Sequence, residues 1–244
     1  MNTSLRLRFL LSAVLGVAAC AQLAMAADLG GAPPRRVIHE GPSPYDRAFS
    51  WSGLYIGAHI GYGWSEADWQ FSTTPGVSTS HGGNGGLLGG QIGYNIQSGH
   101  FVWGIEGDLS AAWLDGGTSC PNPGFNCQHS YNWLASVRGR AGTLINGNRT
   151  LLYVTGGAAW ADVDYAAKDA ATGALFGTGF SNTHFGWVAG AGIEHRLTHN
   201  LSAKLEYLYY GFDSVTAPAG TLGAGPASLD LTSQTLRFGL NFKF

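Results

Sequence analysis

The chain has 244 residues and a formal net charge of −2; charged residues make up only 11% of it, whereas aromatic residues make up 12%. So few charges argue against nucleic-acid binding, and so many aromatic side chains argue against intrinsic disorder. The small net charge does not identify a partner.

Residues 1–26 have the pattern of a secretory signal peptide. A basic start is followed by an apolar run from Phe9 to Ala19, and Ala24-Met25-Ala26 supplies a cleavage site. A lipoprotein box that would lipidate Cys20 is the alternative, and it is less favoured because the cleavage site follows at a suitable distance. We therefore expect export from the cytoplasm.

Residues 27–50 contain four prolines and no alternation of apolar and polar residues, which predicts a flexible periplasmic arm. The domain is expected to cover residues 51–244. No segment in it has the roughly 18 unbroken apolar residues that a membrane helix needs.

The domain contains eight segments in which apolar residues tend to alternate with polar residues or glycine, so that even-numbered and odd-numbered positions form two different faces. In the first segment Leu54, Ile56 and Ile60 share one parity, while the other parity is mostly glycine. The parity of the fifth segment is unclear because both of its faces are apolar or small. A period of two predicts β-strands. The segments lie at 54–64, 88–97, 101–113, 131–142, 151–163, 185–196, 201–209 and 235–244.

The links between these segments alternate in length. Short turns are expected near 98–100, 146–149 and 198–200, and long links near 66–86, 114–130, 164–183 and 212–232. Tight turns at one rim and long loops at the other are typical of an outer-membrane β-barrel. A soluble β-sandwich also alternates. Aromatic residues near the strand ends, and charges that would face a single closed space, favour the barrel.

Several stretches resemble the opacity-type, porin-like family of small outer-membrane β-barrel proteins of Gram-negative bacteria. They include "WSGLYIGAHIGYGW", "GIEGDLSAAW", "WLASVRGRAG", "LLYVTGGAAW", "GWVAGAGIEHRL" and the terminal "LRFGLNFKF". The resemblance covers residues 51–244 and implies a monomeric, eight-stranded, antiparallel transmembrane β-barrel of the OmpA/OmpX-like type. It also implies a C-terminal signal read by the barrel assembly machinery, carried here by Phe238, Leu240, Phe242 and Phe244.

This family includes surface antigens, structural envelope proteins and some haemin binders. We therefore predict a structural outer-membrane protein and surface antigen that supports envelope integrity, with a narrow porin or a haemin receptor as alternatives. Expected partners are outer-membrane lipid, lipopolysaccharide and the barrel assembly machinery. Peptidoglycan and a host surface stay open, and nucleic acid is not expected.

Charged residues recur at the positions expected to face the lumen. Those on the third and fourth segments are predicted to pair across the strands. The set is interpreted as a plug, because an eight-stranded barrel is just wide enough for its own side chains; a polar or proton-linked pathway is the alternative. The residues are Glu106, Asp108, Arg138, Arg140, Glu194, Arg196, Lys204, Glu206 and Arg237.

The sequence shows no nucleophile with a base at a recognisable spacing, so we predict neither an enzyme nor a cofactor. Cys120 and Cys127 bracket a short part of the second long link and resemble a loop-closing disulfide formed in an oxidising compartment. A metal site there is less favoured because only His129 is close. With His81 and His184, His129 would lie on the outer rim, where histidine and aromatic residues together could hold haemin.

Overall fold

A computed structural model describes residues 50–71, 78–120, 122, 124–222 and 225–244. The predicted signal peptide and nearly all of the predicted arm therefore lie outside the described residues. The described part is built from β-strands: β1 (Gly53–Phe71), β2 (Ser78–Ser98), β3 (Phe101–Ser119), β4 (Phe125–Ile145), β5 (Thr150–Asp169), β6 (Leu175–Arg196), β7 (Leu201–Phe212), β8 (Val215–Ala217) and β9 (Ala227–Lys243).

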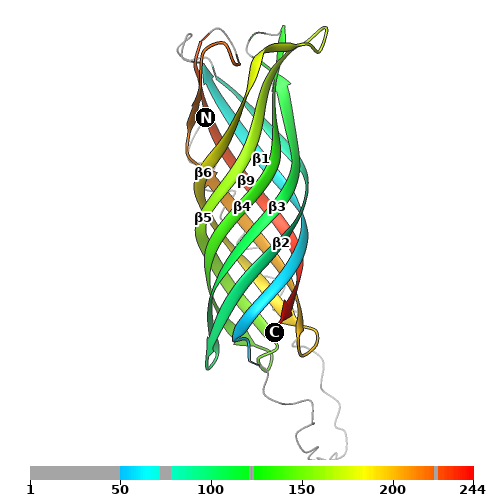
Figure 1. The fold of residues 1–244 in the computed structure, drawn as a ribbon, viewed down its shortest axis with the longest axis vertical. Helices are drawn as coiled ribbons and strands as arrows, with labels where there is room; N and C mark the ends of the chain where they lie inside the picture. Colours follow the sequence, from blue (N-terminus) through cyan, green and yellow to red (C-terminus); the bar gives the residue numbers. More distant parts are fainter. Residues whose placement is uncertain (1–49, 72–77, 121, 123, 223–224) are drawn as a thin grey trace, which may run out of the picture. The chain divides into compact units, whose positions relative to one another are not determined.

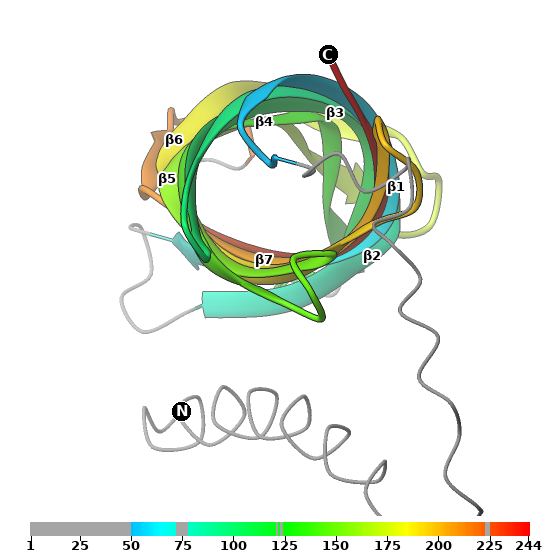
Figure 2. The same cartoon turned by 90° about the horizontal axis from the view of Figure 1, so that it is seen from below.

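The strands form one closed, antiparallel barrel. Each strand from β1 to β7 pairs with the next, β7 pairs with β9, and β9 pairs with β1 to close the ring. The short β8 only extends the sheet beside the outer part of β9, so the ring itself has the eight strands that the sequence predicts. Figures 1 and 2 show the tilted strands and their closure. Closure leaves the ring without sheet edges, which lipid could not hydrogen-bond.

The tight turns lie where the sequence predicts them. β4 and β5 are joined through Asn146, Gly147 and Asn148, all with positive φ (53°, 63° and 66°), a backbone region that Gly and Asn adopt at low cost. The turns at this end of the barrel and the β9 terminus lie at the bottom of Figure 1. We call this the periplasmic end, and the opposite end the outer end.

The long links are much shorter than predicted. Most of residues 66–86, 114–130 and 164–183 belong to β1 to β6, whose strands have 19 to 22 residues. A tilted strand needs only about 9–11 residues to cross a bilayer. The strands therefore continue well beyond the membrane, and their polar, glycine-rich outer halves look like loops in the sequence because their outward faces meet water.

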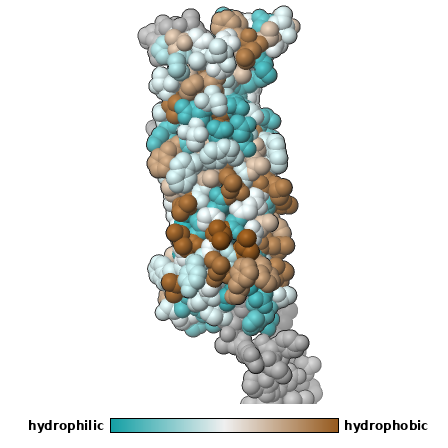
Figure 3. Space-filling model, viewed as in Figure 1, coloured by the Kyte–Doolittle hydropathy of each residue, from teal (hydrophilic) through white to brown (hydrophobic). Residues whose placement is uncertain are grey.

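Large apolar side chains cover the outward face of the lower part of the barrel. Ile60, Trp103 and Leu109, for example, are 58–59% exposed, as lipid contact requires. Figure 3 shows apolar residues gathered towards the periplasmic end on the face in view, with more polar residues above them. Aromatic side chains mark the outer boundary of this belt: Tyr62, Trp64, Trp113, Trp133, Trp160, Phe185, Trp187 and Tyr209. We call them the outer aromatic girdle.

The structure settles the parity of the fifth strand. Leu151, Tyr153 and Val163 of β5 are buried, whereas Leu152 and Val154 are 40% and 62% exposed. The inward face of β5 thus carries the odd-numbered residues. Among the described residues, no helix is long and apolar enough to span a membrane.

Candidate functional site

A buried network of ion pairs crosses the middle of the lumen and is centred on Glu106 of β3. Its Oε1 atom lies 2.6 Å from Nη2 of Arg138 and 2.8 Å from Nζ of Lys204. Its Oε2 atom accepts a 2.7 Å hydrogen bond from the hydroxyl of Tyr55 and lies 3.5 Å from Nη1 of Arg140. Strands on opposite sides of the lumen therefore supply cations to one carboxylate.

Arg138 makes the largest number of ion pairs among the cations. It lies 3.1 Å from Oδ2 of Asp108 and 3.0 Å from Oε1 of Glu206, besides its contact with Glu106. Arg237 of β9 lies 2.7 Å from the other oxygen of Asp108. The predicted pairing between the third and fourth segments is thus confirmed, because Glu106 is the direct register partner of Arg138.

The remaining pair extends the network towards the periplasmic end. Nη2 of Arg140 lies 2.6 Å from Oε2 of Glu194, whose other oxygen accepts hydrogen bonds from Ser202 (2.5 Å) and Asn241 (2.9 Å). Four carboxylates and four cations take part, so their formal charges sum to 4 − 4 = 0. Every one of them is nearly fully buried: Glu106, Asp108, Glu194, Glu206, Arg138, Arg140, Lys204 and Arg237.

Close approach between β2 and Tyr55 helps to build this network. A Cβ atom at Gly93 of β2 would lie 2.3 Å from the Tyr55 hydroxyl oxygen. Glycine at this position therefore leaves the space that the tyrosine needs to reach Glu106. This gives a packing reason for one of the glycines on the inward face of the second segment.

Trp51 closes the lumen at the periplasmic end. It is 3% exposed and packs with Val102, Leu144, Leu151 and Tyr153.

Two hydrogen bonds hold Trp51 in this position. Its indole Nε1 donates a 3.0 Å hydrogen bond to the carbonyl oxygen of Asn148 in the β4–β5 turn, and its backbone N–H donates one of 2.8 Å to Oε1 of Gln97 in β2. Because β1 and the β4–β5 turn lie on different sides of the ring, the Trp51 side chain reaches across the mouth of the barrel.

The outer half of the lumen is filled by an apolar and aromatic core. Trp69, Tyr131, Tyr165, Leu208 and Leu229 are among its members and are 0–2% exposed. The open centre of the ribbon in Figure 2 is thus occupied by side chains. The described part of the lumen thus has three layers of buried side chains, apolar at both ends and ionic in the middle.

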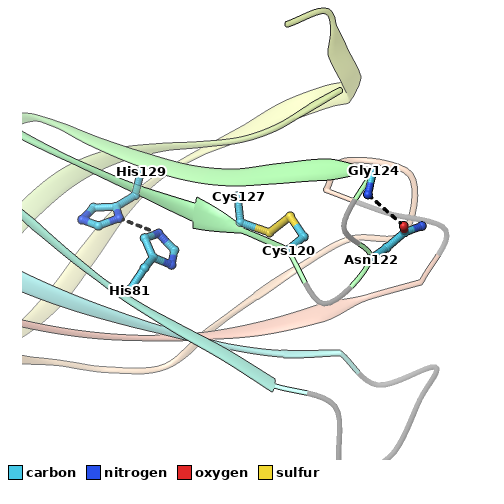
Figure 4. Close-up of a disulfide and its surroundings, with 6 residues drawn as sticks. All are labelled: His81, Cys120, Asn122, Gly124, Cys127 and His129. Carbon is cyan, nitrogen blue, oxygen red and sulfur yellow. Dashed lines mark hydrogen bonds between the residues drawn. A yellow bond between two sulfur atoms is a disulfide. The ribbon is translucent and has the colours of Figure 1, made fainter. Parts of the chain in front are cut away.

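His81 and His129 were predicted in long outer loops and His184 at the entrance to the sixth strand, and these positions are wrong. His81, His129 and His184 belong to β2, β4 and β6 and are 5%, 2% and 0% exposed. Nδ1 of His129 lies 2.9 Å from Nε2 of His81 (Figure 4), while His184 contacts the hydroxyl of Tyr165. The structure brings two of the three together, but inside the outer core, where a macrocycle could not reach them without opening the barrel.

Cys120 and Cys127 lie at disulfide distance across the outer end of the β3–β4 connection (Figure 4). Their Cα atoms are 5.2 Å apart, within the usual range for a disulfide. Cys127 is buried against the outer core, whereas Cys120 is only partly buried. The bond therefore ties the tip of the hairpin to the filled part of the lumen.

We expect reduction of this disulfide, or the double change Cys120→Ser and Cys127→Ser, to loosen the hairpin tip and leave the barrel intact. Closing a short loop stabilises a fold by about 2 kcal/mol, and here that effect acts on residues outside the membrane. Limited proteolysis should show faster cleavage near Asn122 with unchanged heat-modifiable migration on gels. Loss of the folded band would contradict this expectation.

Other predicted residues have different surroundings. Arg196 lies at the periplasmic end of β6, is only half-buried and takes no part in the central ion pairs, because the strand ends there. Phe238, Leu240 and Phe242 point outward from β9 and are 42–49% exposed, and Phe244 follows the strand at 69% exposed. Their role in assembly stays a prediction.

Three tyrosines of the lumen were not singled out from the sequence. The hydroxyls of Tyr55 and Tyr153 donate hydrogen bonds to Glu106 and Glu206, and the hydroxyl of Tyr210 accepts one from Arg237. Strand parity could have identified Tyr55, which lies opposite the apolar face of the first segment. No such signal was available for Tyr153, because both faces of its segment look alike.

A closed barrel with a lipid-facing apolar belt, aromatic girdle and polar lumen defines this protein as a small outer-membrane β-barrel protein of a Gram-negative bacterium. The chain belongs to the family described as "Outer membrane protein beta-barrel domain", whose model matches residues 11–244. The soluble β-sandwich alternative is therefore excluded.

Relatives with the same location are similar over most of the chain. A 22 kDa outer membrane protein of Rhizobium leguminosarum bv. viciae is 30% identical over 204 residues, covering 83% of this chain and 82% of the relative. A 31 kDa outer-membrane immunogenic protein of Brucella melitensis biotype 1 is 30% identical over 233 residues, covering 91% and 93%. The solved structure of OprG from Pseudomonas aeruginosa has the same fold (TM-score 0.53, 12% identity, covering 79% of this chain and 98% of that chain).

Proposed function

We propose that this protein is a sealed structural barrel and surface antigen that contributes to the integrity of the outer membrane. The observation that carries the proposal is the neutral network of eight buried charged side chains, enclosed between two apolar layers. Moving an ion or solute through the barrel would require these pairs to separate in a region without bulk water, which costs several kcal/mol per ion.

The surface-antigen part of the proposal is supported by the relatives and by the length of strands β1 to β6. Several relatives are described as outer-membrane immunogenic proteins. Strands that continue beyond the girdle hold a large, ordered surface outside the membrane, where other molecules can reach it. A narrow porin and a haemin receptor have less support, because the lumen is filled and the candidate histidines are buried.

Planar-bilayer recording tests the sealed lumen directly. We expect purified, refolded protein to insert without sustained single-channel steps, while a large open porin in the same bilayer conducts. Stable, uniform open steps that scale with the number of inserted barrels would contradict the proposal and restore the porin alternative. Heat-modifiable migration of the same sample shows that the barrel is folded when it is measured.

A further inference from the structure

A concave site lies on the outer wall of the barrel, beside the outer aromatic girdle and away from the lumen. Its volume is about 450 Å³, within the range of about 300–1,000 Å³ that small-molecule sites have. It spans three neighbouring strands, β9, β1 and β2. The outward-facing residues around it are Trp64, Glu66, Gly82, Asn84, Thr232 and Gln234.

Gly82 forms the floor of this site, which we call the wall pocket. It is the register partner of Glu66, with Asn84 next along the outward face of β2. A Cβ atom at Gly82 would have only one neighbour within 4 Å, the Ser65 carbonyl oxygen at 3.6 Å. The backbone would therefore accept a side chain here, and any side chain would fill the hollow.

Trp64 forms an aromatic wall of the pocket. It is 46% exposed and is positioned by an edge-to-face contact with Tyr62, whose ring centroid is 5.3 Å away. The indole thus presents apolar surface to the pocket together with a polar N–H group, a combination that suits a ligand with both apolar and hydroxyl surfaces.

The polar side chains around the pocket are oriented by neighbours. Asn84 donates to the Tyr62 hydroxyl, Glu66 accepts a 3.3 Å hydrogen bond from Ser80, and Gln234 accepts a 2.7 Å hydrogen bond from Tyr207. Each of these bonds uses one polar atom of the side chain. The second atom of each, a carbonyl oxygen, a carboxylate oxygen and an amide NH₂ respectively, remains for a ligand.

An aromatic face beside an amide and a carboxylate is the chemistry that recognises a sugar ring. The axial C–H groups of a pyranose pack on the indole, and its hydroxyl groups donate to carboxylate and amide oxygens or accept from the amide NH₂. The residues that line the pocket include no lysine or arginine, and one of them is a carboxylate. Phosphate or carboxylate groups would therefore be repelled, and an uncharged sugar unit is favoured.

The place of the pocket identifies the source of that sugar. It opens sideways, in the plane of the membrane, and Trp64 belongs to the girdle that marks the outer boundary of the apolar belt. At this height a barrel in the outer leaflet is surrounded by the saccharides of neighbouring lipopolysaccharide molecules. We propose that the wall pocket binds an uncharged sugar unit of the lipopolysaccharide core. This binding is independent of whether the lumen conducts.

Saturation-transfer NMR on the refolded full-length barrel in phosphocholine nanodiscs tests this proposal, with dephosphorylated lipopolysaccharide core oligosaccharide as the probe. We expect saturable binding by the unchanged protein. Trp64→Ala removes the aromatic wall and Gly82→Val fills the pocket, so each should weaken sugar binding about tenfold. Gln234→Ala provides a further variant that leaves the sheet backbone unchanged.

Gly86→Val is the matched control. Gly86 lies on the same strand and also faces outward, but it lies outside the pocket. A Cβ atom there would meet only one atom within 4 Å, the Gly61 carbonyl oxygen at 4.0 Å, much as at Gly82. We expect the control to bind as the unchanged protein does, with heat-modifiable migration preserved in every variant.

Four results would overturn sugar binding at the wall pocket, and a fifth would overturn its assignment to lipopolysaccharide. The four are the absence of binding by the unchanged protein, equal binding by Trp64→Ala and Gly82→Val, an equal loss in Gly86→Val, and binding that requires phosphate groups or added Mg²⁺. Maltotriose serves as an unrelated soluble saccharide, and equal affinity for it would overturn the assignment to lipopolysaccharide. None of these results depends on the conductance measurement.

Discussion

Replacing Arg138 with alanine is expected to destabilise the folded barrel by about 3–5 kcal/mol, the cost of leaving buried carboxylates without a partner. Arg138 contacts three carboxylates. Glu206 would lose most, because its other cation, Lys204, lies 3.8 Å away. Glu106 keeps a contact of 2.8 Å with Lys204 and is better protected.

Equilibrium unfolding of the refolded barrel in urea measures this loss. The second change Glu206→Gln, made in the Arg138→Ala protein, should recover part of the stability because it removes the most isolated negative charge. Arg149→Ala is the control: this arginine is exposed in the β4–β5 turn, and its removal should leave the unfolding free energy essentially unchanged. If Arg138→Ala left the unfolding free energy unchanged, as the control should, water in the lumen would have to solvate the carboxylates. The sealed-barrel proposal would then lose its main support.

Lowering the pH from 7.5 to 4.5 is expected to destabilise the outer core through His129. This residue lies above the girdle, outside the membrane-spanning part of β4. Burial first, and then the neighbouring His81, lower the pKa of His129 from 6.5 to about 4. Burial also lowers the pKa of His81. The carboxylates of Asp115 and Asp68 act on His129 and His81 respectively in the opposite direction, with smaller effect.

The sign follows from the lowered pKa. The folded barrel disfavours the protonated imidazole of His129. The contribution of His129 to the unfolding free energy is therefore fully present above about pH 6.5 and is lost as the pH falls from there towards 4. At 1.36 kcal/mol per pH unit, the loss at pH 4.5 is about 2–3 kcal/mol. The difference in unfolding free energy between the unchanged protein and His129→Gln, compared at the two pH values, isolates this contribution from the other acidic and basic groups.

His100→Gln serves as the control for the pH experiment, because His100 is exposed in the turn between β2 and β3. It should show the same pH dependence as the unchanged protein, whereas His129→Gln should show less. A pH dependence that is identical in all three proteins would mean that protonation of the buried pair does not affect the outer core.

Parity in the sequence predicted much of the lumen. Glu106, Arg138 and Glu206 fall on the polar face of alternating segments, and all three are buried. Their assignment needed only the two-residue period of a strand, because one face must meet lipid and the other the lumen. The same reasoning failed for Tyr153, since its segment has apolar or small residues on both faces.

The outer half of the barrel was predicted less well. His81 and His129 were expected in loops because glycine and polar residues surround them in the sequence. The structure continues β2 and β4 through these positions. Outside the bilayer the outward face of a strand meets water, so it loses the apolar alternation that reveals a strand within the membrane, while its inward face still packs in the core.

The sequence by itself determined the strand class of the domain, the outward apolar belt, and the set of charges that face the lumen, because each depends only on local periodicity. The tertiary structure decided which of these charges meet. Lys204 reaches Glu106 across 98 residues and Arg237 reaches Asp108 across 129, in each case between strands that do not pair with each other. Such contacts depend on the tilt and stagger with which the ring closes, and these belong to the whole barrel rather than to any one segment.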